Sequence, residues 1–267
     1  MSTHIDPAGA PGGDTLPPPT AELMGCRFDT VDLDQAVDRA LSWIDCPQRR
    51  SHTIVTVNVA ILMMMRQDPQ LAESVHAADM VVADGTPLVW VSPWGGDPVP
   101  HRVTGVDLMM ELLRVGNERG LSVFLLGTTQ ERLDALVRVV HERYPGVRIA
   151  GSRNGYFTRE QDAEVTAQIR GSGADVLLMG MPAPMKEIWS ERQREALDTP
   201  VILGVGGAFD VLAGYVKRAP VPLQKAGLEW AWRLMLEPRK LWRRYLVTNM
   251  TFLGLVARSV VLRFVGR

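Results

Sequence analysis

Short apolar runs that alternate with segments of helical spacing constrain the fold of this 267-residue chain most strongly. The runs are apolar along their whole length rather than at every second position, which is typical of parallel strands covered on both faces. Strands and helices that alternate in this way form βαβ units. We therefore predict an α/β fold with a mostly parallel sheet flanked by helices, of the Rossmann-like kind. The predicted strands are 52–57, 80–83, 121–126, 147–150, 175–179 and 201–204, and the predicted helices are 31–44, 106–119, 131–144, 159–170 and 185–197.

Charge divides the chain into regions. Residues 217–267 contain eleven Lys or Arg and two acidic residues, a net charge of +9, whereas residues 1–216 carry a net charge of −10. We predict a disordered leader over 1–20, an α/β core over 21–216 and a basic, amphipathic helical appendage over 217–267. Because the whole chain has a net charge of only −1, we expect no nucleic-acid partner. The basic appendage instead predicts an anionic partner.

The end of the appendage, from about Leu241 to Arg267, has the pattern of a helix that lies on a membrane. Its uncharged stretch from Tyr245 to Ala257 has thirteen residues, whereas about 20 apolar residues are needed to span a bilayer. Only two cysteines occur, and the first twenty residues lack an apolar run, which indicates a reducing compartment and no signal peptide. We expect a cytoplasmic protein peripherally associated with the inner face of the plasma membrane, bound to its anionic surface.

Polar or glycine-rich residues follow four of the predicted strands. In open α/β sheets ligands bind at the carboxyl ends of the strands, so these clusters are candidate binding residues. Each also has a simpler structural interpretation: Asp84-Gly85 can be a turn, Asn58 and Asp210 can cap helices, and Gly127-Thr-Thr can be a tight turn. The clusters are Thr56-Val-Asn58, Asp84-Gly85-Thr-Pro87, Gly127-Thr128-Thr129 and Gly204-Val-Gly206-Gly207-Ala-Phe-Asp210.

The sequence predicts no metal site and no cofactor. Asp32-Leu-Asp34 has the DxD spacing of a metal site, yet it lies at the start of a predicted helix, where Asp is expected as a cap. The five histidines are scattered without ligand spacing. Gly204-Val-Gly-Gly lacks the rest of a dinucleotide fingerprint and follows the last predicted strand, which argues against a dehydrogenase.

Seven motifs resemble those of the WecG/TagA/CpsF bacterial glycosyltransferases, glycosyltransferase family 26. The resemblance covers residues 22–252, nearly all of the chain beyond the predicted leader. Its short motifs are IVTVN (54–58), VVADG (81–85), RVTGVDLM (102–109), VFLLG (123–127) and GYF (155–157). Its long and specific ones are ILGVGGAFDVLAGYVKRAP (202–220) and, within 227–246, GLEWAWRL followed by EPRKLWRRYL.

The resemblance implies an inverting, metal-independent transfer of a sugar from a UDP-sugar to a polyprenyl-pyrophosphate-linked saccharide, in the synthesis of cell-surface polysaccharide. A donor of the UDP-N-acetylmannosamine type is expected first. The alternative is UDP-glucose or UDP-glucuronic acid, in exopolysaccharide synthesis. A remote alternative is a catalytically inert nucleotide-binding protein that interacts with membranes. Separately from its function, the chain is a candidate homo-oligomer.

The resemblance also assigns roles to residues. Asp84 matches the general base that inversion requires, and Thr56 matches a threonine that faces the reacting sugar. Asp210 matches a residue suited to the uracil ring, whose N3–H a carboxylate can accept. Further donor contacts are expected at Asn58, Gly85, Gly127, Lys186 and Gly206, and contacts to the leaving group or the acceptor phosphates at Arg233, Lys240 and Arg243.

Lys186 departs from the family pattern. The family often has a GSPxQE motif, whereas the segment here is Pro182-Ala-Pro-Met-Lys-Glu187, with Lys186 at the glutamine position. A lysine can neutralise a phosphate as a point charge. The departure bears on the sugar specificity that the glutamine would support, and some members of the family also have lysine at this position.

Overall fold

The computed structural model describes residues 19–95, 97–236 and 238–265 and confirms the α/β architecture. Six strands form one sheet in the order β4-β3-β8-β7-β5-β6, and every neighbouring pair is parallel. Three of the predicted strands have the predicted bounds, and the other three are displaced along the chain by one to three residues. The strands are β3 (His52–Val57), β4 (Met80–Ala83), β5 (Ser122–Gly127), β6 (Arg148–Arg153), β7 (Val176–Gly180) and β8 (Val201–Gly204).

Helices cover both faces of this sheet, so the strands are apolar on both sides. Ile54 of β3 enters a core shared with one set of helices, whereas its neighbour Val55 enters the core on the opposite face. This alternation explains why the strand sequences show no polar face. The first face is covered by α1 (Leu33–Asp45), α5 (Gly105–Arg119), α6 (Gln130–Arg143) and α9 (Ala208–Leu212); the second by α2 (Val59–Met65), α3 (Pro69–His76), α4 (Thr86–Gly95), α7 (Asp162–Ser172) and α8 (Met185–Leu197).

Several elements were not anticipated from periodicity. An antiparallel hairpin of β1 (Thr20–Leu23) and β2 (Cys26–Asp29) turns through Met24 and Gly25, both with positive φ, as the twist of a tight hairpin requires. The helix α2 is buried at six of its seven residues, so it has no polar face to give a period of 3.6. The helices α3, α4 and α9 complete this group, whereas the predicted helix 159–170 is divided into the short helix η1 (Arg159–Gln161) and α7.

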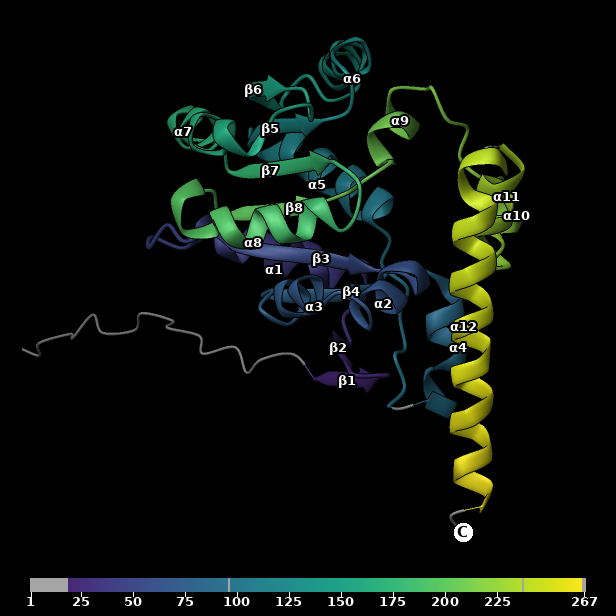
Figure 1. Ribbon diagram of the computed structural model, residues 1–267. Coiled ribbons are helices and arrows are strands. Elements are labelled where there is room, and N and C mark those ends of the chain that lie inside the picture. The colour runs from purple at the N-terminus through teal and green to yellow at the C-terminus, as the bar shows by residue number, and fades with distance from the viewer. Residues whose placement is uncertain (1–18, 96, 237, 266–267) are drawn as a thin grey trace, which may run out of the picture.

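The appendage forms three helices, α10 (Val221–Lys225), α11 (Glu229–Leu236) and α12 (Pro238–Val265). The long α12 packs against α2 and α4, and Phe252 is buried in the core that these helices share. Figure 1 shows α12, in yellow, along the side toward which the carboxyl ends of the strands point. Within the described part of the chain, no helix combines the length and the apolar character needed to cross a membrane.

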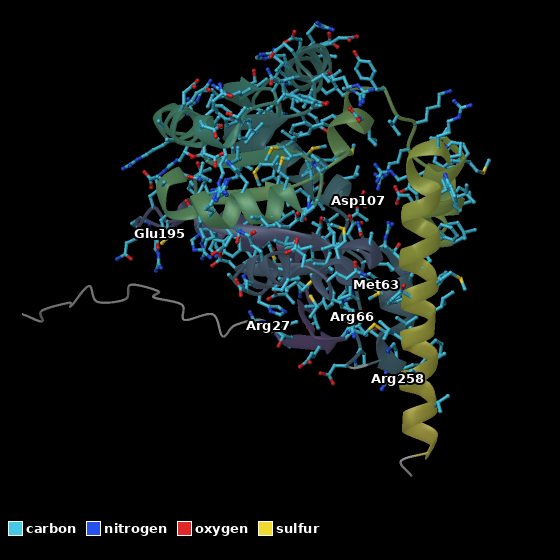
Figure 2. The ribbon with its side chains drawn as sticks, viewed as in Figure 1. Arg27, Met63, Arg66, Asp107, Glu195 and Arg258 are labelled. Carbon is cyan, nitrogen blue, oxygen red and sulfur yellow. The ribbon has the colours of Figure 1, made fainter. Side chains whose placement is uncertain are left out.

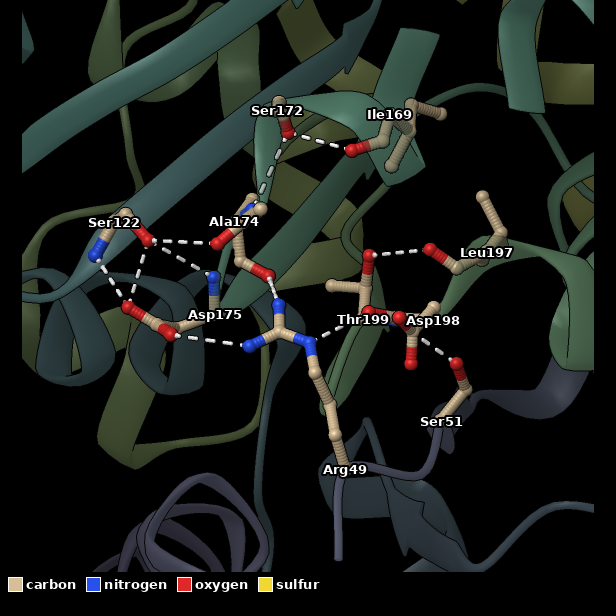
Figure 3. A network of polar contacts seen from close by, with 11 residues as sticks. Arg49, Ser51, Ser122, Ile169, Ser172, Ala174, Asp175, Leu197, Asp198 and Thr199 are labelled. Carbon is tan, nitrogen blue, oxygen red and sulfur yellow. Dashed lines mark hydrogen bonds and ion pairs between the residues drawn. The ribbon is translucent and has the colours of Figure 1, made fainter. Parts of the chain in front are cut away.

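The opposite, amino edge of the sheet is held by a dense polar network (Figure 3). The Asp175 carboxylate accepts hydrogen bonds from the backbone N–H and the hydroxyl of Ser122, at 2.8 and 2.7 Å. Arg49 donates to the carbonyls of Ala174 and Asp198, at 2.6 and 2.9 Å. Charged side chains here therefore tie the strand starts to one another.

Candidate active site

Glycines at the ends of β4 and β5 bring backbone rather than bulky side chains to the carboxyl edge of the sheet. Gly85 and Gly127 have φ of +148° and +139°, which L-residues with a side chain rarely adopt. At Gly127 a Cβ would also lie 2.6 Å from the backbone of Gly180 on β7. These positions require glycine for structural reasons and keep the edge open to a ligand.

Asp84, the predicted base, lies at this edge directly after β4. Its backbone N–H bonds to the Val57 carbonyl at 2.8 Å, which fixes the end of β4 against β3. Desolvation raises the pKa of the Asp84 carboxyl to about 6, and the negative charge of Glu229 acts in the same direction. The Arg233 and Arg102 guanidinium groups and a backbone hydrogen bond from Gly105 oppose this rise in the pKa. A carboxylate with a raised pKa is a stronger proton acceptor and still ionises near neutral pH.

Thr56 lies on the central strand β3, in register with Val82 of β4. Its side chain is buried, and the first residue of α5, Gly105, lies close against it: a Cβ on Gly105 would be 3.3 Å from the Thr56 hydroxyl oxygen. The backbone of Gly105 also bonds to Asp84. Thr56 and Asp84 therefore both lie against the start of α5.

Lys186 reaches the same region from α8. It is 5% exposed, and its stem lies against Gly204, where a Cβ would be 2.9 Å from Lys186 Cδ. Burial lowers the pKa of Lys186, while the negative charge of Asp84 favours the ammonium form. The ammonium donates to Glu187 Oε1, and the buried Glu187 Oε2 has no hydrogen-bond partner among the described residues. The pair borders a small polar cavity with room for about one water molecule, lined also by Ser190.

Asn58 caps a helix, which is the structural alternative to a donor contact that the sequence left open. Its Oδ1 accepts the backbone N–H of Ile61 at 3.1 Å and caps α2. The cap engages only the oxygen of the amide, so a donor contact through the side-chain nitrogen is compatible with it.

Asp210 lies in the first turn of α9 and makes no capping bond there. Its Oδ2 pairs with Arg132 of α6 at 2.8 Å, and the guanidinium of Arg132 also lies over the ring of Tyr215, 5.0 Å from its centre. Asp210 Oδ1 is buried without a hydrogen-bond partner in the described structure. A buried acceptor of this kind is costly unless something donates to it. Asp210, through Arg132, and Gly127, at the end of β5, thus both lie near the start of α6.

Arg233 connects the appendage to the core. A Cβ on Gly207 would be 2.7 Å from Arg233 Nη2, so the guanidinium lies against the loop after β8, and its charge acts on Asp84. The preceding turn of α11 is anchored by Glu229, whose carboxylate lies 3.1 Å from Arg102. The side chains of Lys240 and Arg243 lie outside the described residues.

A second ion pair extends this anchor. Arg218 pairs with Asp107 at 2.5 Å, and Asp107 also accepts the Thr104 hydroxyl at 2.7 Å. Figure 2 shows Asp107 on the side of the sheet that faces the appendage, and Glu195 on the opposite side. Sequence reasoning missed Arg102, Asp107, Arg218 and Glu229 as members of the site. Their common signal was their presence in the family motifs, because Arg102 and Asp107 lie in RVTGVDLM and Arg218 and Glu229 in the two long C-terminal motifs.

The structure assigns Asp32 of the DxD segment a structural role. Its side chain accepts the backbone N–H of Gln35 at 2.9 Å, and the side-chain oxygen of Gln35 accepts the backbone N–H of Asp32 at 3.0 Å. The two bonds form a capping box at the start of α1. Among the described residues, no group of three His, Cys, Asp or Glu side chains has the arrangement of a metal site.

A desolvated carboxylate and several cations therefore lie at the carboxyl ends of a parallel sheet, which is where α/β proteins bind their ligands. The model of the Glycosyl transferase WecG/TagA/CpsF family matches residues 21–264, and the chain belongs to this family of glycosyltransferases. Two similar proteins come from Staphylococcus aureus, strains NCTC 8325 / PS 47 and MRSA252. Each is 31% identical over 222 residues, which cover 83% of this chain and 87% of the relative. Both are named N-acetylglucosaminyldiphosphoundecaprenol N-acetyl-beta-D-mannosaminyltransferase.

Proposed function

We propose that this glycosyltransferase moves a sugar from a UDP-sugar to a saccharide carried on a polyprenyl pyrophosphate, with inversion and without a metal ion. The observation that carries the proposal is Asp84: a carboxylate of raised pKa at the carboxyl edge, beside the buried Thr56 and within the field of Arg233. The names of the Staphylococcus aureus relatives support the lipid-linked acceptor and an N-acetylmannosamine-type donor. UDP-glucose and UDP-glucuronic acid are the alternative donors.

In the proposed reaction Asp84 removes the proton from the acceptor hydroxyl as its oxygen attacks the anomeric carbon. The bond between that carbon and the UDP oxygen breaks, and UDP leaves with the electron pair. Arg233 is suited to the charge that develops on UDP, because a guanidinium offers several donors in a fixed geometry. We assign the same role to Lys240 and Arg243, either for UDP or for the acceptor pyrophosphate.

We place the donor nucleotide between the loop after β5 and the start of α9. The unpartnered Oδ1 of Asp210 can accept the uracil N3–H, while Arg132 holds the other carboxylate oxygen. Thr129, the residue before α6, makes no side-chain cap, which leaves the first backbone N–H groups of that helix suited to the diphosphate. Gly85, Gly127 and Gly206 let the backbone approach the donor, and Asn58 and Lys186 border the sugar.

A lipid-linked acceptor places the reaction at a membrane. We propose that the chain works in the cytoplasm, bound peripherally to the anionic inner face of the plasma membrane through the basic appendage. A self-assembled oligomer remains a prediction from sequence alone.

The test is a transfer assay with a panel of UDP-sugars and a short-chain, water-soluble lipid-pyrophosphate N-acetylglucosamine acceptor, in excess chelator. We expect transfer from UDP-N-acetylmannosamine with inverted configuration. Transfer from UDP-glucose or UDP-glucuronic acid alone would move the chain to the alternative donor class. Activity that disappears with the chelator and returns with manganese would contradict the metal-independent mechanism.

A further inference from the structure

Two exposed tryptophans of the α/β core lie beside the candidate active site. Trp90 is 53% exposed and Trp94 is 56% exposed, and both lie on α4, which begins two residues after Asp84. Their four-residue spacing places them on one face of the helix. The sequence of α4, TPLVWVSPWG, contains no charged residue. This composition is unusual for a surface helix, whose outer face is normally charged or polar.

The outer face of α4 continues onto the appendage. Leu88 of α4 and Phe252 of α12 are buried in the same core, and the two helices contact each other. Figure 1 shows them side by side. Away from Phe252, α12 exposes Met250, Leu253 and Val261. Each of these two contacting helices therefore carries exposed apolar side chains, and exposed apolar patches on a surface mark interaction sites.

Charge indicates the occupant of this surface. Arg258 is exposed on α12 between Leu253 and Val261, and Figure 2 shows it at the level of α4. The segment that contributes α12 carries a net charge of +9. A second copy of the chain would bring the same positive charge to the contact, whereas a bilayer with anionic headgroups complements it. Tryptophan is enriched at membrane–water interfaces because one end of the indole is polar and the rest is apolar.

We propose that α4 inserts Trp90 and Trp94 into the headgroup region of an anionic bilayer, so that the core itself binds the membrane together with α12. The proposal rests on the proposed lipid-linked acceptor. Insertion of these two tryptophans would bring the start of α4, and with it Asp84, to the level of the lipid surface. A polyprenyl-linked acceptor then reaches the base without leaving the bilayer.

The test compares vesicle binding of the full chain with that of the Trp90→Ser/Trp94→Ser double variant, using phosphatidylglycerol–phosphatidylcholine vesicles. We expect the affinity for vesicles to fall at least about tenfold, since two large apolar side chains no longer enter the interface. The matched control is Tyr156→Ser, which removes a 77% exposed aromatic side chain from the loop after β6 and should bind as the unmodified chain does. Unchanged binding by the double variant would overturn the proposal.

Two further measurements keep the result interpretable if the double serine variant folds poorly. In the Trp90→Phe/Trp94→Phe chain, quenching of tryptophan fluorescence by brominated lipids should be clearly weaker than in the unmodified chain, and equal quenching would overturn the proposal. Sedimentation velocity that shows a lost oligomer, with vesicle binding intact, would assign α4 to a contact between copies and overturn it as well. Transfer to the water-soluble acceptor needs no vesicles, so failure of the proposed reaction is observed separately.

Discussion

Two aspartates bracket the four-residue strand β4, and their surroundings differ. Asp79, before the strand, accepts the backbone N–H of Thr53 at 2.8 Å and the guanidinium of Arg194 at 2.9 Å, one partner for each carboxylate oxygen. Asp84, after the strand, is desolvated, and its pKa rises to about 6. At the amino edge a carboxylate holds strands together, whereas at the carboxyl edge desolvation raises the pKa of a carboxyl group, at a cost in stability when it is ionised. The difference is the one expected if Asp79 has a structural role and Asp84 the proposed catalytic one.

The largest expected effect is the loss of turnover in Asp84→Asn. An amide cannot accept the proton of the acceptor hydroxyl, so the rate should fall by roughly 10²–10⁴-fold, the usual contribution of a general base. Affinity for UDP should stay near that of the unmodified enzyme, as measured by calorimetry. The matched control is Asp79→Asn at the other end of β4, which should keep its rate per folded molecule. If Asp84→Asn retains half its activity, Asp84 is a turn residue only.

For stability we expect the reverse order: a substitution at Asp79 should be more destabilising than one at Asp84. Asp79→Ala leaves the buried N–H of Thr53 and the Arg194 guanidinium without their partner, so the free energy of unfolding should fall by about 1–3 kcal/mol. The same measurement on Asp84→Asn, by denaturant titration at pH 7, should show no loss. Equal destabilisation by both substitutions would mean that the two ends of β4 are structurally alike.

The raised pKa of Asp84 also predicts how stability depends on pH. Because the carboxyl titrates near 6 when folded and near 4 when unfolded, its contribution is fully present below about pH 4 and is lost as the pH rises through 6. Relative to Asp84→Asn, the unmodified chain should therefore lose at most about 3 kcal/mol over this interval, and less where solvent screens the charge. Parallel unfolding curves for both chains from pH 4 to 7 would contradict the desolvated state of Asp84.

The smallest expected effect concerns donor recognition. Asp210→Ala removes the proposed uracil acceptor and should raise the KM for the UDP-sugar about tenfold with a smaller change in kcat, because uracil is held equally in the ground and transition states. Arg132→Ala, which removes only the partner of Asp210, is the comparison and should have the weaker effect. An unchanged KM in Asp210→Ala would leave that residue a purely structural ion-pair partner.

The strands and several residues of the candidate site can be predicted from the sequence, whereas one buried helix and the ion pairs between distant segments cannot. The apolar runs predict the six strands, because strands covered on both faces need apolar residues at every position. The polar residues at or beyond the carboxyl ends of these runs include Thr56, Asp84 and Asp210. Helix α2 escapes prediction because it is buried all round and has no period. The ion pairs of Arg102 with Glu229 and Arg218 with Asp107 join segments more than 100 residues apart, and no local pattern encodes such a contact.

Lys186 marks the limit of the resemblance. Its position in the motif shows a departure from the frequent glutamine, but not that its ammonium is buried against Glu187, nor that the negative charge of Asp84 favours its ammonium form. This interaction between Lys186 and Asp84 depends on α8, β8 and the end of β4, which come together only in the folded sheet.

The most direct test of the contrast is the pH dependence of kcat/KM with the water-soluble acceptor, for the unmodified chain, Asp79→Asn and Asp84→Asn. The account predicts that activity rises with pH around an apparent pKa of about 6 in the first two proteins, because Asp84 must lose its proton to act as the base. The residual activity of Asp84→Asn should lack this rise. A rise around the same pKa that persists in Asp84→Asn would assign the titration to another group and contradict the proposed role of Asp84.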